Sequence, residues 1–373
     1  MGSETLGQGA CRVLQRMVSR VVLKKVKKRK PDGLMGKGHG ILFNMIILGI
    51  IAGGVTRLSE GLARGRPCKP GGPDKIFKAP DGTTVLSLGL SPGGDLLVGG
   101  TEAGALLVFS VEKSRPPVSL DLGGSVRTVR ILSKNTNMKP RGHLIAAGGD
   151  FGLVIVQYEN NKKYKVLKVL KKKGGIMALA HNARGGELAS AGRDRKITIW
   201  DMESWKKKRV IKGHTSWVST LVFSLDGQKI FSGGWDNTVR AFRVSDGESL
   251  WTNYEHQFAL NRLMALRDRK TLVSLSDDGR LRLIRVSDGR RFQLSRVGPG
   301  VGAVVMGKKE VVVMSSWRGR IMILSYPELR PIGSFSAQLS PVNSMAGLAS
   351  GLVAVAGGQG RINLWVLPVS CIH

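Results

Sequence analysis

The fold of this chain can be read from one stretch, Gly213 to Ser245, with the sequence GHTSWVSTLVFSLDGQKIFSGGWDNTVRAFRVS. The stretch contains three short apolar runs, at residues 218–223, 228–232 and 239–244. The pairs Asp226-Gly227 and Asp236-Asn237 separate these runs, and both pairs favour the backbone angles of tight hairpin turns. The stretch therefore predicts three antiparallel strands. A sheet of this size cannot bury its own faces, so similar sheets are expected beside it.

The same pattern recurs along the chain. Equivalent positions near the end of the third run are spaced by 48, 43, 42, 42, 40 and 41 residues, and they are Phe109, Gln157, Trp200, Phe242, Ile284, Leu324 and Trp365. Pairs of small residues precede most of these runs, although the fifth repeat has Leu275-Ser276 instead. A period of about 40 residues with four short strands per unit is typical of propeller blades.

The repeats resemble those of a known family. Gly213-His214, the run from Leu221 to Gly227 and the triplet from Gly234 to Asp236 resemble a WD repeat, as do residues 191–194 and 197–201. The resemblance extends from about residue 74 to the C-terminus, and it implies an all-β fold, a seven-bladed β-propeller over residues 75–373. The last repeat ends after its third strand. Lys75 to Lys78 is therefore predicted to supply the missing fourth strand and close the ring.

The composition limits the function. The 373 residues include 58 Lys and Arg against 26 Asp and Glu, a net charge of +32, which favours polyanionic neighbours such as nucleic acid, anionic lipid or acidic protein. Cys11, Cys68 and Cys371 are too few and too scattered for a disulfide framework or a zinc site, so a reducing compartment is expected.

Three segments precede the repeats. Residues 1–37 form a basic arm, in which residues 12–30 have the pattern of an amphipathic helix, and residues 38–56 are predicted to add an apolar helix. Residues 57–74 are rich in Pro and Gly and are predicted to be a linker. The predicted fold is thus a propeller with an N-terminal helical extension.

The N-terminal helices leave several interpretations open. The basic arm is similar to a mitochondrial targeting segment, and it is equally compatible with a solvated or RNA-contacting arm. The apolar segment, above all Ile41 to Val55, is about 28 Å long as a helix and is a candidate membrane anchor. A helix buried in a large assembly, or part of a removed targeting segment, are the alternatives.

The family resemblance also implies a hydrogen-bonded brace within each blade. In the fourth repeat His214, Ser232 and Asp236 match this brace, while Phe242 stands in place of the usual Trp. A Ser, a His and an Asp together are also found in hydrolases, but no oxyanion site accompanies them here. We therefore expect a structural role, and we expect no catalytic residue, cofactor, metal ion or small-molecule substrate.

Two runs of cations flank the outer strands of the second and third blades. The predicted polyanion-docking residues are Lys162, Lys163, Lys165, Lys168, Lys171, Lys172, Lys173, Lys206, Lys207, Lys208, Arg209 and Lys212. Lysine on an edge strand also prevents edge-to-edge pairing, which is the alternative interpretation. So many cations on neighbouring blades favour docking on phosphate, without reading of base sequence.

A partner-binding face is predicted from residues in the turns and loops at one end of the blades, and they are Arg193, Trp217, Trp235, Trp317 and Arg318. Trp and Arg are frequent anchors of protein interfaces. Packing against neighbouring blades is the alternative.

Together, these patterns predict a non-enzymatic scaffold within a large protein complex. The main hypothesis is a subunit of a mitochondrial assembly, docked on a membrane or on ribosomal RNA. The alternative hypothesis is an RNA-processing or ribosome-assembly factor of the nucleus or cytosol.

Overall fold

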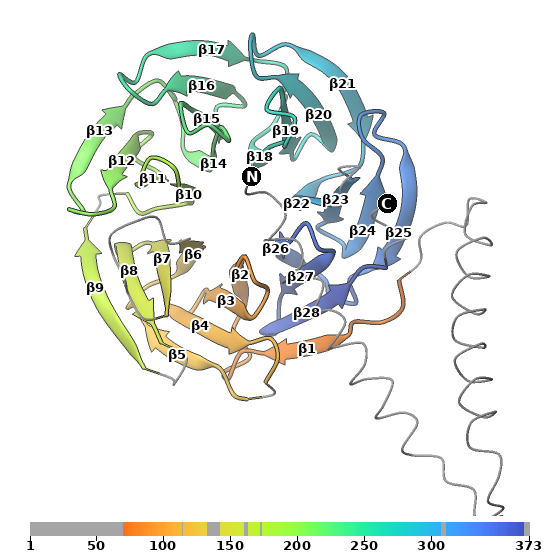
Figure 1. Ribbon diagram of the computed structural model, residues 1–373. Helices are drawn as coiled ribbons and strands as arrows, with labels where there is room; N and C mark the ends of the chain where they lie inside the picture. Colours follow the sequence, from red (N-terminus) through yellow and green to blue (C-terminus); the bar gives the residue numbers. More distant parts are fainter. Residues whose placement is uncertain are drawn as a thin grey trace, which may run out of the picture. The chain divides into compact units, whose positions relative to one another are not determined.

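The computed structural model describes residues 70–368, except 114, 133–141, 160–162, 172–173 and 307–310. The described residues form seven four-stranded antiparallel sheets, arranged in a ring (Figure 1). Each sheet is one propeller blade, and its strands follow one another from the centre of the ring to its rim. The seven-bladed all-β propeller predicted from the sequence period is therefore confirmed.

The first four blades take their strands in order along the chain. Blade 1 consists of β2 (Val85–Leu90), β3 (Leu96–Thr101), β4 (Ala105–Ser110) and β5 (Val118–Asp121). Blade 2 consists of β6 (Val126–Leu132), β7 (His143–Gly149), β8 (Gly152–Tyr158) and β9 (Tyr164–Leu170). Blade 3 consists of β10 (Ala178–Asn182), β11 (Glu187–Ala191), β12 (Ile197–Asp201) and β13 (Lys207–Ile211). Blade 4 consists of β14 (Val218–Phe223), β15 (Lys229–Gly234), β16 (Val239–Arg243) and β17 (Ser249–Asn253).

The last three blades complete the ring. Blade 5 consists of β18 (Leu260–Ala265), β19 (Thr271–Ser276), β20 (Arg280–Arg285) and β21 (Arg291–Arg296). Blade 6 consists of β22 (Gly300–Met306), β23 (Val311–Ser316), β24 (Arg320–Leu324) and β25 (Pro331–Ser336). Blade 7 consists of β26 (Val342–Gly347), β27 (Leu352–Gly357), β28 (Arg361–Val366) and the early strand β1 (Lys75–Lys78).

The ring is closed by strands from the two ends of the propeller. β1 pairs with β28 in antiparallel register, from Lys75 opposite Leu364 to Lys78 opposite Arg361. Phe77 of β1 also packs edge-to-face on Phe109 of blade 1, with the ring centroids 5.3 Å apart. The predicted closure is thus present, and it joins blade 7 to the beginning of the propeller.

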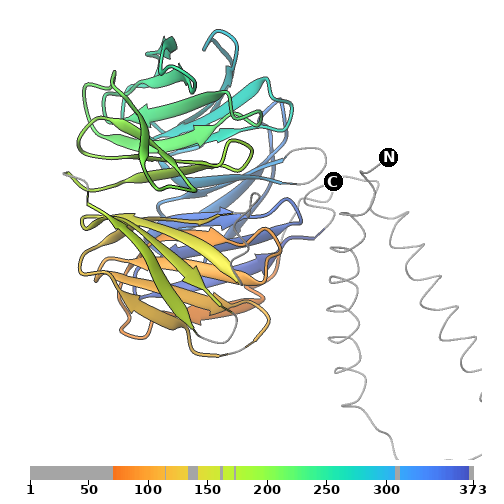
Figure 2. The same ribbon diagram turned by 60° about the vertical axis from the view of Figure 1, so that its left-hand side comes forward.

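Apolar side chains fill the space between each pair of neighbouring sheets and hold the blades together. Figure 2 shows the ring of sheets at an angle. Close approach of the backbones explains the small-residue pairs. A Cβ atom on Gly100 would lie 2.6 Å from the carbonyl oxygen of Val126 in the next blade, and one on Gly149 would lie 2.0 Å from that of Ser125. A larger residue at these positions would push strands apart.

The chain direction gives the ring two different faces. In each blade the turn between the second and third strands lies at the same end as the loop that leads into the first strand, because successive strands run antiparallel. We call this side the entry face. It collects a turn and a loop from every blade, so residues far apart in the sequence meet there.

The predictions for the N-terminal segments lie largely outside the described residues. The basic arm of residues 1–37, the apolar segment of residues 38–56 and linker residues 57–69 belong to the part that is not described. Residues 70–74 form neither helix nor strand. Within the described part of the chain, no helix is long and apolar enough to cross a membrane.

Candidate docking surfaces

The predicted aromatic and arginine residues of blades 3 and 4 meet on the entry face. Trp217 precedes β14 and Trp235 lies in the turn after β15, and their ring centroids are 4.6 Å apart. The guanidinium of Arg193, from the turn after β11, lies 5.0 Å from the centroid of the Trp217 ring. With this cation–π contact and the tilted ring pair in place, Trp235 is still 49% exposed. The three residues form one preassembled surface patch.

The other two predicted residues lie further around the ring. Trp317 and Arg318 are in the turn between β23 and β24 of blade 6, and Trp317 is 60% exposed. Its backbone is fixed on both sides, since its N–H donates to Pro299 O at 3.3 Å and its carbonyl accepts from Val342 N–H at 3.0 Å. A large apolar side chain is thus held in solvent by an ordered turn.

Sequence reasoning missed two further aromatic residues of the entry face. Tyr254 and Phe258 lie in the loop between β17 and β18, and they are 72% and 59% exposed. The loop is tied to the turn of blade 4, because the Asn237 side chain donates to Gln257 O at 3.1 Å. The sequence contained one signal for them, because two aromatic residues stand in a loop that has no periodic pattern of apolar residues. With Trp235 and Trp317, they give blades 4 to 6 a series of exposed rings.

The predicted polyanion-docking residues, from here on called the basic rim, lie on or beside the outer strands of blades 2 and 3, which are neighbours in the ring (Figure 1). β9 contains a bulge at Leu167, so that Lys165 pairs with Gln157 and Lys168 pairs with Ile155. Positions 155 and 157 lie on the same face of blade 2, and Ile155 belongs to the core shared with blade 3. The bulge therefore turns both lysines toward blade 3. In a regular strand, residues three positions apart would point to opposite faces of the sheet.

Blade 3 contributes cations to the same rim, but several of them already have partners. Lys208 Nζ lies 2.6 Å from Glu187 Oε1, and Lys207 Nζ lies 5.7 Å from the centroid of the Trp200 ring. Arg209 donates to the carbonyl oxygens of Ser245 and Asp246 in blade 4. The exposed cations Lys163, Lys165, Lys168, Lys171, Lys206 and Lys212 make up the remaining described part of the basic rim. Lys162, Lys172 and Lys173 lie outside the described residues.

The three predicted brace residues of blade 4 are in contact. His214 Nδ1 lies 2.9 Å from Asp236 Oδ2, and His214 Nε2 lies 2.7 Å from Ser232 Oγ. Burial alone would raise the pKa of Asp236, but the contacts with His214 and the Thr215 N–H hold this pKa well below its ordinary value. Ser232 is fully buried, so it cannot meet a substrate from solvent. The arrangement fits a brace that ties the entry loop to the sheet.

Blade 5 contains a second brace that the sequence reasoning missed. His256 Nε2 lies 2.8 Å from Ser274 Oγ, and His256 Nδ1 lies 3.2 Å from Asp278 Oδ2. Arg282 adds a contact of 2.8 Å from its Nη1 to Asp278 Oδ2. The signal was in the spacing, since both blades place the Ser 18 and the Asp 22 residues after the His. Burial, together with the Arg282 charge, lowers the pKa of His256 to about 4.

Comparison with known proteins agrees with this architecture. The family described as "WD domain, G-beta repeat" matches residues 164–201 and 205–243, which extend from β9 of blade 2 through blade 3 to β16 of blade 4. The chain is a WD-repeat protein. The matched residues include the WD repeat's tryptophan in blade 3, where Trp200 Nε1 donates to Ser190 Oγ at 2.8 Å.

Several curated proteins are similar to parts of the WD-repeat protein. The nuclear distribution protein PAC1 of Arthroderma benhamiae is 30% identical over 128 residues, 31% of this chain and 28% of that protein. The U5 small nuclear ribonucleoprotein 40 kDa protein of Dictyostelium discoideum is 24% identical over 148 residues, 39% of this chain and 42% of that protein. The protein HIR1 of Mycosarcoma maydis is 26% identical over 219 residues, 59% of this chain and 20% of that protein. The chain thus spans less than half of each of these relatives.

Proposed function

We propose that this WD-repeat protein is a non-enzymatic scaffold that binds a partner protein on its entry face. The observation that carries the proposal is the series of rings held in solvent there by ordered turns and loops, Trp235, Tyr254, Phe258 and Trp317. Trp, Tyr and Phe are enriched in the centres of protein interfaces relative to the rest of a protein surface. The preassembled contact between Trp217 and Trp235 reduces the entropy lost when a partner binds.

The setting we propose is a nuclear or cytosolic assembly, with RNA processing as the favoured context. Two of the similar proteins are named for the nucleus, and one is a component of a small nuclear ribonucleoprotein. These names support the nuclear or cytosolic hypothesis better than the mitochondrial one. The mitochondrial and membrane-anchor interpretations depended on residues 1–56, which lie outside the described part of the chain.

The test is affinity purification of the tagged full-length protein, in parallel with two variants. Replacing Trp235 and Phe258 by Ala removes two rings of the entry face, whereas Phe292→Ala removes a ring that is 42% exposed on the outer strand β21. The recovery of partner proteins should fall at least about tenfold with the first variant and stay unchanged with the second. Equal recovery from all three proteins would contradict docking on the entry face. Circular dichroism confirms that each variant is folded.

The basic rim supports a second docking activity, toward the phosphate backbone of nucleic acid. Its bulged strand places Lys165 and Lys168 on one side, toward the cations of blade 3, where a single polyanion can meet both sets. Each phosphate contact releases condensed counterions, so RNA affinity should fall steeply with salt.

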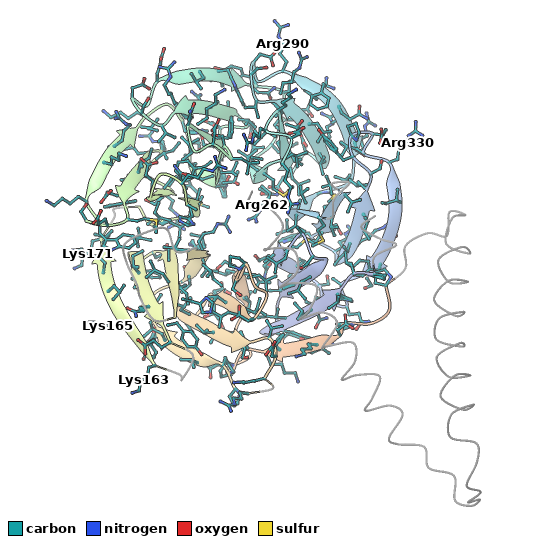
Figure 3. All side chains as sticks on the ribbon, viewed as in Figure 1. Lys163, Lys165, Lys171, Arg262, Arg290 and Arg330 are labelled. Atoms are coloured by element: carbon teal, nitrogen blue, oxygen red, sulfur yellow. The ribbon has the colours of Figure 1, made fainter. Side chains whose placement is uncertain are left out.

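The rim is tested with matched charge removals. Lys165 and Lys168 replaced by Gln should reduce the slope of log affinity against log salt for single-stranded RNA by about 1 to 2. Replacing Arg290 and Arg330, which lie on the opposite side of the rim (Figure 3), by Gln removes the same charge and should leave the slope nearly unchanged. Equal slopes for both double variants would show that RNA binds through net charge alone.

A further inference from the structure

The seven inner strands surround a central channel that contains a cavity of about 150 Å³. Residues of β2, β6, β10, β14, β18, β22 and β26 line it. The lining is strongly polar, with Ser219, Thr220, Asn261, Asn343 and Ser344 among its members. The polar groups come from five of the inner strands, each of which contributes between one and three of them, so no local sequence pattern brings them together.

Two arginines from blades that are not neighbours meet in this channel. Arg262, on β18, reaches into the middle of the ring (Figure 3), and Arg130, on β6, lines the same cavity. Arg130 Nε donates to Leu179 O at 3.1 Å. The Nε of Arg262 is buried and has no hydrogen-bond partner among the described residues. A buried guanidinium with an unsatisfied N–H is costly unless a ligand completes it.

The channel does not neutralise these charges. The only ionisable side chains among the described residues that line the cavity are Arg127, Arg130 and Arg262. Arg127 is paired with Asp150 at 3.3 Å, whereas Arg130 and Arg262 have no carboxylate partner in the described part of the chain. Burial and the charge of Arg130 lower the pKa of Arg262 to about 9. Both arginines remain cationic at neutral pH, and each raises the energy of the other.

The neutral groups of the channel also favour an acceptor as ligand. Thr220 Oγ1 accepts the Leu263 N–H at 3.0 Å, and Ser344 Oγ accepts the Leu88 N–H at 3.0 Å. Each hydroxyl therefore keeps its own proton for donation. The channel therefore concentrates hydrogen-bond donors and positive charge in one small space, from two guanidinium groups and two hydroxyl groups.

We propose that the central channel binds a phosphate-sized oxyanion, with Arg262 and Arg130 as its cationic ligands. A tetrahedral oxyanion accepts hydrogen bonds on every side and carries the charge that the channel lacks. The cavity has the volume of about five water molecules, which is enough for one phosphate group. The site is independent of the entry face and of the basic rim, because its residues come from the inner strands only.

The proposal is tested by thermal unfolding and calorimetry of the full-length protein in chloride buffer, with inorganic phosphate added at constant ionic strength. Phosphate should raise the unfolding temperature of the wild type. Arg262→Gln should lower phosphate affinity at least about tenfold, while Arg262→Lys, which keeps the charge, should retain part of it. Arg290→Gln is the control, since this exposed rim residue (Figure 3) lies far from the channel and its loss removes the same net charge.

Two further measurements keep the outcome decisive. Without phosphate, Arg262→Gln should unfold at a temperature equal to or higher than that of the wild type, because the substitution removes an unpaired charge. If Arg262→Gln does not fold, phosphate affinity is measured on Arg130→Gln instead. The second measurement uses O-phosphoserine to distinguish two kinds of ligand. If O-phosphoserine stabilises the protein, the channel binds a phosphomonoester; if only inorganic phosphate does, the channel binds the free ion. Absence of stabilisation by either, or equal loss of affinity in Arg262→Gln and Arg290→Gln, would overturn the proposal.

Discussion

At the scale of single residues, buried polar contacts are what distinguish one blade from another. Trp200 Nε1 in blade 3 is satisfied by Ser190 ten residues earlier, whereas Trp365 Nε1 in blade 7 is buried with no partner among the described residues. The residue ten positions before Trp365 is Val355, which has no acceptor. The same indole position is therefore anchored in one blade and held only by packing in the other, partly against Phe335.

The anchor in blade 3 gives a first prediction. Ser190→Ala should destabilise the propeller by about 1 to 3 kcal/mol, because the Trp200 N–H would stay buried without an acceptor. Urea unfolding followed by tryptophan fluorescence measures this change. Ser295→Ala, on the outer strand β21, is the control and should change stability by less than about 0.5 kcal/mol. An unchanged unfolding midpoint in Ser190→Ala would show that the hydrogen bond between Trp200 and Ser190 contributes no net stability.

The brace of blade 5 gives a prediction about pH. The pKa of His256 is about 4 in the folded protein and 6.5 ordinarily, so the unfolded chain binds more protons between these values. Stability from this group is therefore complete above pH 6.5 and is lost as the pH falls toward 4. Between pH 7 and pH 5 the wild type should lose about 2 kcal/mol more than His256→Gln. Parallel pH dependence of the two proteins, measured by urea unfolding, would contradict this assignment.

At the scale of elements, a single short strand completes the ring. β1 has only four residues, yet it covers the outer edge of β28 and places Phe77 against blade 1. Asp74 adds two contacts, since its N–H donates to Leu364 O and its carboxylate accepts from Val366 N–H at 2.7 Å. The bulge in β9 has a comparable effect at the rim, where one extra residue sets the direction of two lysines.

The closing strand is tested by truncation. A chain that begins at residue 80 lacks β1 and should unfold at least about 6 °C below a chain that begins at residue 67, because it loses a strand ladder and the packing of Phe77. Differential scanning calorimetry on both chains measures the difference. The second chain retains all described residues and serves as the control. Equal unfolding temperatures would show that β1 does not close the ring.

At the scale of the whole molecule, positive charge acts against the folded state. The chain has a net charge of +32, and two of its cations lie partly buried in the channel of the ring. Like charges at distances beyond about 8 to 10 Å are screened at moderate salt. Mobile anions therefore reduce the electrostatic cost of folding.

Salt should accordingly stabilise this protein. Raising sodium chloride from about 20 mM to about 300 mM should increase the unfolding temperature by several degrees, since repulsion among exposed cations is screened. Potassium chloride should have the same effect, because the anion and the ionic strength are unchanged. A constant or falling unfolding temperature would indicate that surface ion pairs, rather than repulsion, dominate the electrostatics.

The sequence by itself determined the period, the number of blades, the closing strand and the brace of blade 4. These features are local, because each blade must repeat the same strands, turns and small residues for its sheet to pack on the next. The brace of blade 5 was also within reach, since His256, Ser274 and Asp278 repeat the spacing of blade 4.

Only the tertiary structure decided what meets across the ring. Arg130 and Arg262 are 132 positions apart and share one channel because both stand on inner strands, and no local pattern records that meeting. The lysines of β9 face blade 3 because of a bulge that strand periodicity does not show. The exposed rings of the entry face gather because every blade brings a turn and a loop to the same side. Closure of the ring is the physical reason for the shared channel and for the entry face, since it sets distances that the order of residues alone leaves open. For the lysines of β9 the reason is the register of one strand pair.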